Sequence, residues 1–143
     1  MIKTIIFDYA GVITPTKNNY LFAKKYHKRF GLTAEELMSL TYDNWRPALV
    51  SKSAEKRFWK ELSRELDINP DLLLDLITET FPINSQIIKI IDKLKKRYKT
   101  ILLSNQVESW LEKVIEENNL RSRFDYLINS YKFRTTKPGE IFF

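Results

Sequence analysis

The 143-residue sequence contains no cysteine, one histidine and three glycines. The absence of cysteine excludes disulfide bonds, thiolate zinc sites and cysteine nucleophiles. The single histidine, His27, lies among lysines in KKYHKRF, which disfavours a catalytic triad of serine and histidine. The glycines form neither a GxxxxGKS/T loop nor a GxGxxG turn, the motifs that hold nucleotide phosphates. If the chain is an enzyme, a carboxylate is the most natural nucleophile that remains.

Long hydrophobic runs are also missing. No apolar run approaches the roughly 18 residues that a membrane-spanning helix needs. The N-terminal segment MIKTIIFDYA carries Asp8 where a signal peptide would remain apolar. Both features predict a cytoplasmic protein that has no membrane partner.

The net charge is +6 and the isoelectric point is about 9.4, a balance that can attract nucleic acid. The lysines and arginines cluster at 24–30 and 93–99, late in two predicted amphipathic helices, where cations complement the helix dipole. Acidic residues are interspersed among them, and no nucleic-acid-binding motif accompanies the charge. We therefore expect solvated helix faces and no nucleic-acid partner.

Short apolar runs alternate with helical patterns in two separate parts of the chain. The runs are interpreted as buried parallel strands at 2–7, 100–104 and 125–130, and the helical patterns cover 85–97 and 107–118. This alternation predicts an α/β fold with a three-layer, Rossmann-like parallel sheet, incomplete at its C-terminal end. Residues 1–14 and 83–143 would form this core.

Residues 15–82 are far too many for an ordinary crossover between strands and carry their own apolar stripes. Four helices are expected here. The first carries an apolar stripe of Phe22, Tyr26 and Phe30 and ends at Gly31, and the second begins with a capping box at Thr33 and runs toward Tyr42. The third is capped by Ser53 and runs through Leu66, and the fourth runs from about Asp71 to Thr80. We therefore expect this segment to form a separate helical cap lobe.

Polar residues follow each predicted strand. Asp8 ends the first, Ser104 and Asn105 end the second, and Asn129 and Ser130 end the third. Parallel sheets bind ligands at the carboxyl ends of their strands, so these residues predict one polar cluster. Lys137 follows in a loop, directly before a helix expected to begin with Pro138 at its first position.

Three motifs in this order resemble the haloacid dehalogenase (HAD) superfamily of phosphatases and hydrolases. They are FDYAGVIT at the first strand, LLSNQ at the second and TTKPGEIF around the late lysine. The helical insertion lies where that superfamily carries its cap, so the resemblance covers essentially the whole chain. The FDxxGVI opening and the third cap helix look most similar to the branch of glucose-1-phosphatase-like proteins and the phosphatase domain of epoxide hydrolases.

The resemblance implies a Mg²⁺-dependent phosphatase that acts on small phosphorylated metabolites. Asp8 would attack phosphorus and form an aspartyl phosphate, which water hydrolyses; an aspartate with an ordinary pKa of about 3.9 is already ionised at neutral pH. Ser104 would donate a hydrogen bond to a phosphoryl oxygen, and Lys137 would offset negative charge. Asp8 and the backbone carbonyl of Ala10 would bind the Mg²⁺.

Three further residues are candidates for substrate contact. Asn105 adjoins the predicted cluster, and the turn at Gly11 offers backbone N–H groups to a phosphate. Arg46, in the cap, would reach over the site to bind a substrate anion. A solvated surface arginine beside Trp45 is the alternative for that residue.

Ala10 departs from the family pattern, because many of its phosphatases carry a second aspartate there as a general acid. Alanine cannot donate a proton, and losing a positioned acid costs about 10² to 10⁴ in rate. Two alternatives therefore remain beside the phosphatase: a non-catalytic interaction module with the same fold, and a 2-haloacid dehalogenase. A departing halide needs no proton, although such dehalogenases usually carry a tyrosine at this position.

The sequence given ends at Phe143, six residues after Lys137, whereas the resembling family continues to a fourth strand with paired acidic residues. We expect this strand to be missing and the 143-residue chain alone to be a poor catalyst. The strand at 2–7 would then lie at an open edge of the sheet, through which a homodimer would form.

Overall fold

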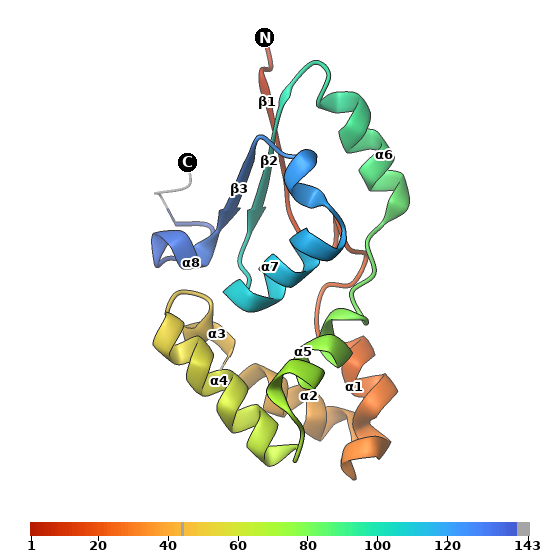
Figure 1. The fold of residues 1–143 in the computed structure, drawn as a ribbon, viewed down its shortest axis with the longest axis vertical. Coiled ribbons are helices and arrows are strands. Elements are labelled where there is room, and N and C mark those ends of the chain that lie inside the picture. The colour runs from red at the N-terminus through yellow and green to blue at the C-terminus, as the bar shows by residue number, and fades with distance from the viewer. Residues whose placement is uncertain (44, 140–143) are drawn as a thin grey trace.

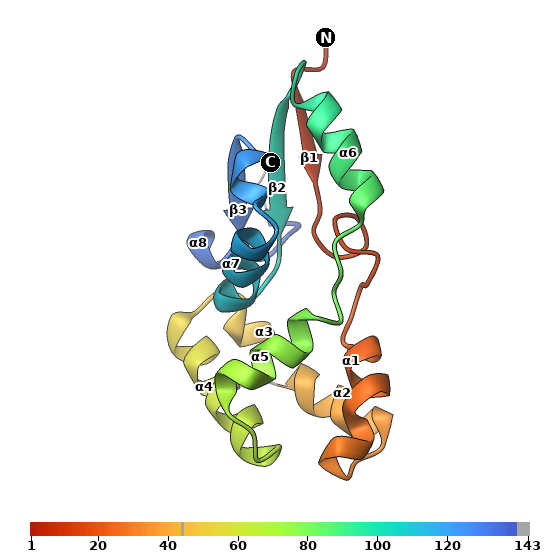
Figure 2. The same cartoon turned by 45° about the vertical axis from the view of Figure 1, so that its right-hand side comes forward.

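A three-stranded parallel sheet and an inserted lobe of helices make up the fold (Figures 1 and 2). The computed structural model describes residues 1–43 and 45–139. Its elements are β1 (Thr4–Phe7), α1 (Tyr20–Tyr26), η1 (His27–Phe30), α2 (Ala34–Asp43), α3 (Trp45–Ala48), α4 (Lys52–Glu65), α5 (Pro70–Thr78), α6 (Ser85–Leu94), β2 (Lys99–Ser104), α7 (Glu108–Glu117), η2 (Leu120–Ser122), β3 (Tyr126–Asn129) and α8 (Ser130–Phe133). The predicted α/β fold with a helical insertion is confirmed.

The strands follow the order β1-β2-β3, and every pairing is parallel. Right-handed crossovers in this order place α6 and α7 on the same face of the sheet. Phe7 and Leu102, paired in register, are buried beneath these helices. Ile6 and Tyr126 point to the other face and are 50% and 53% exposed. In the described part of the chain, β1 and β3 are the edge strands.

A carboxylate connects the start of β2 to the chain that leads into β3. Asp125 accepts a 2.8 Å hydrogen bond from the Thr100 N–H, and the Thr100 hydroxyl donates to the Arg123 carbonyl at 2.9 Å. The backbone hydrogen bond lowers the pKa of the Asp125 carboxyl below its ordinary value, because it favours the ionised form. These contacts fix the amino ends of two neighbouring strands, opposite the polar cluster.

Helices α1 to α5 form the lobe at the lower end of Figure 1. The predicted capping box is confirmed, since the Thr33 N–H donates to Glu36 at 2.7 Å and the Glu36 N–H donates to the Thr33 hydroxyl at 3.2 Å. Gly31, with φ of 66°, ends η1 as expected. The prediction that Ser53 caps the next helix was wrong: Ser51 is the N-cap of α4, and its hydroxyl accepts from the Ala54 N–H.

The short helices α3 and α8 were not predicted. Pro47 lies in the first turn of α3, where its missing N–H would have no helical partner anyway. At the other end of the described chain, the Gly139 N–H donates to the Thr136 carbonyl at 2.9 Å, so Pro138 lies in a turn. The helix expected from Pro138 falls mainly on residues 140–143, outside the described residues.

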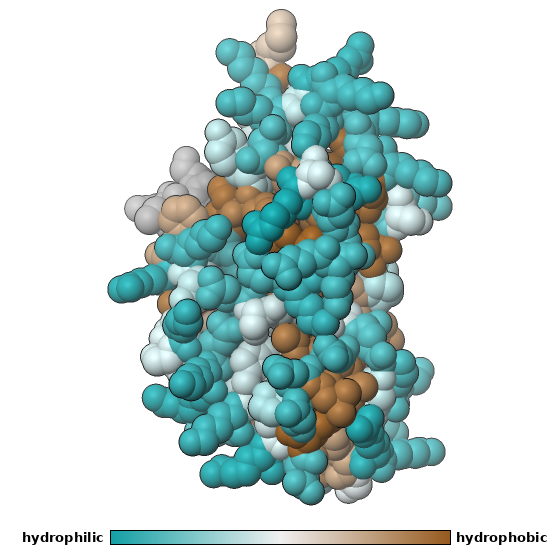
Figure 3. Space-filling view, viewed as in Figure 1, coloured by the Kyte–Doolittle hydropathy of each residue, from teal (hydrophilic) through white to brown (hydrophobic). Residues whose placement is uncertain are grey.

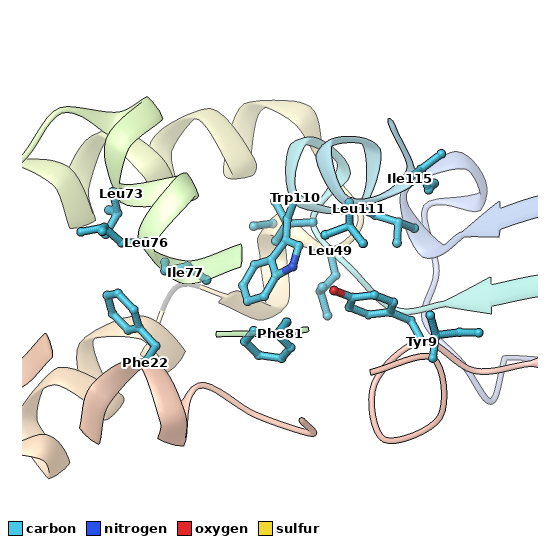
Figure 4. Close-up of a cluster of buried hydrophobic side chains, with 14 of the residues drawn as sticks. Tyr9, Phe22, Leu49, Leu73, Leu76, Ile77, Phe81, Trp110, Leu111 and Ile115 are labelled. Atoms are coloured by element: carbon cyan, nitrogen blue, oxygen red, sulfur yellow. The ribbon is translucent and has the colours of Figure 1, made fainter. Parts of the chain in front are cut away.

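An aromatic contact joins the lobe to the sheet domain (Figure 4). Trp110 of α7 is fully buried, with its ring centroid 4.7 Å from that of Phe81 and 5.1 Å from that of Trp45. Trp110 thus packs toward the cap. Trp59, in α4 of the cap, also reaches the sheet domain, because its indole N–H donates to the Ser109 hydroxyl of α7 at 2.9 Å.

Hydrophilic side chains cover most of the face in Figure 3, with apolar atoms gathered beside the sheet domain and over the helical lobe. Among the residues that the structure describes, no helix has the length and apolar character needed to cross a membrane.

Candidate functional site

Asp8 follows β1 directly, at the carboxyl edge of the sheet. Its Oδ1 accepts two hydrogen bonds, one from the Tyr9 N–H at 2.7 Å and one from the Lys137 ammonium at 2.8 Å. The side chain is 50% exposed, so its other oxygen remains open to a ligand. The structure thus brings together the first and last of the three predicted catalytic residues.

Lys137 is held by contacts at both its ammonium and its backbone. The ammonium also donates to the Leu103 carbonyl at 2.9 Å, and the side chain is only 19% exposed. The Lys137 N–H donates to Asn105 Oδ1 at 2.8 Å, while the Asn105 Nδ2 donates to the Lys137 carbonyl at 3.3 Å. Asn105 was expected to contact substrate; in this arrangement both ends of its amide are used to position the lysine loop.

Ser104 ends β2 beside the end of β1. Phe7 pairs with Leu102, so Ser104 lies two residues beyond this pair and Asp8 lies one residue beyond it, at the same edge. Ser104 is 2% exposed, and no described residue forms a hydrogen bond with its hydroxyl. This hydroxyl is therefore available to donate to a bound anion.

The loop after Asp8 folds back on itself. The Tyr9 carbonyl accepts from the Thr14 N–H at 3.1 Å, and Gly11 has φ of 82°, a conformation that favours glycine. A Cβ on Gly11 would lie 3.0 Å from Cγ of Lys17, which packs over the loop. The backbone N–H groups of the 9–11 turn were expected to help bind phosphate; of these, the Tyr9 N–H already donates to Asp8.

The expected magnesium ligands are the Asp8 carboxylate and the Ala10 carbonyl. No described residue donates a hydrogen bond to that carbonyl, so both oxygens fit a hard cation. Within residues 1–43 and 45–139, no group of three or more acidic or histidine side chains is placed to hold a metal. If Mg²⁺ binds at these two oxygens, water and substrate would complete its octahedral shell.

An open pocket of about 570 Å³ adjoins the polar cluster. Lys137 and Asn105 line it from the sheet domain, and Arg46 lines it from α3 of the cap. The structure thus places the cap arginine across from the predicted site. Arg134 lines the same pocket and was not predicted, although a second cation three residues before Lys137 in FRTTK was a signal in the sequence.

A second cavity, of about 80 Å³, lies on the other side of Asn105. It is lined by Ala10, the two asparagines 18 and 19, Lys17, and the aromatic side chains of the contact between the lobes. No acidic residue is among its described lining residues. The side chain of Ala10 thus faces a space in which the described chain supplies no carboxylic acid.

A family model for haloacid dehalogenase-like hydrolases matches residues 2–143. The chain belongs to this family. No curated protein matches the sequence significantly.

Solved structures of this family share the fold of the chain. A HAD family enzyme from Bacteroides thetaiotaomicron, in complex with magnesium and inorganic phosphate, has a TM-score of 0.69 and 19% identity over 99% of this chain and 76% of its own. A predicted HAD-like hydrolase from Porphyromonas gingivalis has a TM-score of 0.70 and 24% identity over 99% of this chain and 72% of its own. An L-2-haloacid dehalogenase from Xanthobacter autotrophicus has a TM-score of 0.64 and 18% identity over 96% of this chain and 60% of its own.

Proposed function

We propose that this HAD-family chain hydrolyses small phosphomonoesters through a covalent phosphoenzyme, with Asp8 as the nucleophile. The observation that carries the proposal is the 2.8 Å contact between the Asp8 carboxylate and the Lys137 ammonium at the carboxyl edge of the sheet. A nucleophilic carboxylate beside a fixed cation suits attack on an anionic phosphorus centre. The resemblance to the glucose-1-phosphatase-like and epoxide hydrolase branch stays a prediction.

In the first step, Asp8 attacks phosphorus while the bond from phosphorus to the ester oxygen breaks. Oδ1 is occupied by the Tyr9 N–H and Lys137, so Oδ2 is the oxygen open to attack. The leaving alcohol takes a proton from water, because Ala10 cannot supply one. In the second step, water attacks the aspartyl phosphate, releasing inorganic phosphate and restoring the carboxylate.

Charge is the main obstacle to this attack. A carboxylate 4 Å from a phosphate dianion is repelled by about 8 kcal/mol at an effective dielectric constant near 20, and one equally close cation offsets a similar amount. Lys137 is the described cation in direct contact with Asp8. The Ser104 hydroxyl adds a hydrogen-bond donor for a phosphoryl oxygen. Ser104 and Lys137 would thus stabilise the negative charge of the phosphoryl group next to Asp8.

We further propose Mg²⁺ as the cofactor, held by the Asp8 carboxylate and the Ala10 carbonyl. When bound, the ion would neutralise phosphate charge. The bacterial HAD enzyme solved with magnesium and inorganic phosphate supports this choice for the same fold. With two protein oxygens in the described chain, the substrate phosphate and water would complete the octahedral shell.

Hydrolysis of 4-nitrophenyl phosphate in the presence of Mg²⁺ tests the proposal, because nitrophenolate leaves without needing a general acid. Asp8→Asn should lower turnover at least about 10³-fold, as expected when a nucleophile is removed. Asp67→Asn is a matched control, since Asp67 lies in the cap at φ of 47°, which asparagine tolerates. Turnover that survives Asp8→Asn contradicts the proposal.

Assays on the same protein distinguish the two alternatives to a phosphatase, namely a dehalogenase and a non-catalytic interaction module. Asp8-dependent release of chloride from 2-chloropropionate, without phosphatase activity, would favour a dehalogenase. The fold shared with the Xanthobacter enzyme is the reason for including the chloride-release assay. The absence of any Asp8-dependent turnover would favour the non-catalytic interaction module that Ala10 suggests.

A further inference from the structure

The 570 Å³ pocket beside Lys137 carries more positive charge than a single phosphate group requires. Three of its lining side chains are cationic, namely Arg46, Arg134 and Lys137, and its described lining includes no carboxylate. Lys137 is paired with Asp8, whereas neither arginine forms an ion pair with any described residue. The two arginines therefore have no counter-charge within the described chain.

The two arginines come from opposite sides of the pocket. Arg46 lies in α3 of the cap, and Arg134 follows α8 of the sheet domain. In both views of the fold, α8 lies next to the segment that joins α3 to α4 (Figures 1 and 2). An anion between them would contact the cap and the sheet domain together.

One buried residue, Ser130, holds the backbone on both sides of this pocket. The hydroxyl of Ser130, which is 0% exposed, donates to the Leu49 carbonyl at 2.8 Å, and the Leu49 N–H donates to the Arg46 carbonyl at 3.2 Å. The Ser130 carbonyl in turn accepts from the Thr135 N–H at 3.4 Å, directly after Arg134. The backbones that carry the two arginines are thus anchored to the same point of the sheet domain.

We propose that the substrate carries a second anionic group on its leaving group, a carboxylate or a second phosphoryl group, which Arg46 and Arg134 bind. The inference rests on the proposed function, since Lys137, which contacts the proposed nucleophile Asp8, also lines this pocket. Guanidinium groups bind planar or tetrahedral oxyanions through paired hydrogen bonds, so both chemistries fit. A leaving group without this charge would leave the arginines unpaired.

Phosphonates test this inference without turnover, because their carbon–phosphorus bond is not hydrolysed. Calorimetry with Mg²⁺ present would compare methylphosphonate, which has one anionic group, with phosphonoacetate and methylenediphosphonate, which add a carboxylate or a second phosphonate. At least one of the last two should bind about tenfold more tightly than methylphosphonate, as one additional charged hydrogen-bonded pair allows. The tighter of the two identifies the second anion.

Variants assign that gain to the arginines. Arg46→Gln and Arg134→Gln should each remove about tenfold in affinity for the doubly anionic probe and leave methylphosphonate binding unchanged. Arg46→Lys should retain part of the additional affinity, because lysine keeps the positive charge but lacks the paired N–H donors of a guanidinium group. Arg97→Gln is the matched control, since Arg97 is exposed just before the amino end of β2. Equal effects of Arg46→Gln and Arg97→Gln would overturn the inference.

The outcomes separate this inference from the proposed function. Equal affinity for all three phosphonates overturns the second-anion site even if 4-nitrophenyl phosphate is hydrolysed through Asp8. Arginine-dependent binding of the doubly anionic probes supports the site even if that hydrolysis fails.

Discussion

The Lys137 ammonium lies 2.8 Å from Oδ1 of Asp8 and 2.9 Å from the Leu103 carbonyl oxygen. The two residues are far apart in the sequence, and the Asn105 amide holds both the N–H and the carbonyl of Lys137. The lysine is therefore preorganised beside the carboxylate before any substrate binds, which is the condition under which an electrostatic contact lowers a reaction barrier.

Replacing Lys137 by methionine keeps the length of the side chain and removes its charge. Because the repulsion between Asp8 and phosphate would then be less offset, Lys137→Met should lower kcat/KM for 4-nitrophenyl phosphate by about 10²–10³-fold. Steady-state kinetics measures this, with Lys132→Met, on the exposed side of α8, as the control. Similar rates for the two variants would show that Lys137 does not act in the reaction.

Gly11→Ala tests the loop that follows Asp8. Both Gly11 and Gly31 have positive φ, of 82° and 66°, so alanine should destabilise either site by about 1–2 kcal/mol. A Cβ on Gly11 would also lie 3.0 Å from the Lys17 side chain, whereas nothing lies within 4 Å at Gly31. Urea unfolding should therefore show losses in both variants, but only Gly11→Ala should lose turnover. Full activity in Gly11→Ala would show that the loop geometry is not required.

Much of the sheet domain could be predicted because its signals are local. Each strand is a short apolar run followed by a polar residue, and parallel pairing then gathers Asp8, Ser104 and Asn105 at one edge. The capping box of Thr33 and Glu36 is equally local, because its two partners are three residues apart. No knowledge of the rest of the fold is needed for either pattern.

The errors concern features that depend on contacts between distant residues. Ser51 and Ser53 are both plausible caps by sequence, and the choice depends on the path of the chain that precedes α4, which the contact from Ser130 to Leu49 fixes across 81 positions. The pattern of α7 indicates that Trp110 is buried but not that it faces the cap. Arg134 likewise reaches the pocket only because α8 lies next to the segment that joins α3 to α4.

Magnesium binding should depend on phosphate. The proposed site has two protein ligands, the Asp8 carboxylate and the Ala10 carbonyl, and an ion that keeps most of its water binds weakly. Calorimetry of the 143-residue chain should show no saturation by Mg²⁺ in the low millimolar range, and added inorganic phosphate should strengthen binding by supplying another oxygen. Asp8→Ala should abolish the effect of phosphate. Saturation without phosphate would reveal further ligands.

Tyr9→Phe should leave the protein equally stable or slightly more stable. Tyr9 is 0% exposed, and its hydroxyl points toward the Trp110 indole nitrogen (Figure 4), yet neither polar atom has a hydrogen-bond partner among the described residues. Burial raises the pKa of this phenol to about 12, so it stays protonated at neutral pH. Removing a buried, unpaired hydroxyl should change the unfolding free energy by about 0–2 kcal/mol in the stabilising direction. A clear loss in urea unfolding would reveal a partner.

Asp125→Asn should make the free energy of unfolding less dependent on pH in the acidic range. The hydrogen bond from the Thr100 N–H holds the pKa of the Asp125 carboxyl below its ordinary value, so the folded state binds this proton less readily than the unfolded state does. The contribution is therefore fully present above the ordinary carboxyl pKa of about 3.9 and is lost as the pH falls through the folded pKa. The variant keeps an amide oxygen that can accept the same bond, but not the charge.

Urea unfolding of both proteins at neutral pH and in acid measures this difference. The variant should be less stable than the original chain at neutral pH, and the gap should close as the pH falls below the carboxyl range, because protonation of Asp125 then removes from the original chain the charge that the variant already lacks. Asp92→Asn provides a control, since Asp92 meets Arg123 at 3.2 Å through its side chain and is not bonded to the strand backbone. A difference in unfolding free energy that stays constant with pH would show that the charge of the Asp125 carboxylate does not contribute to the stability of the strand ends.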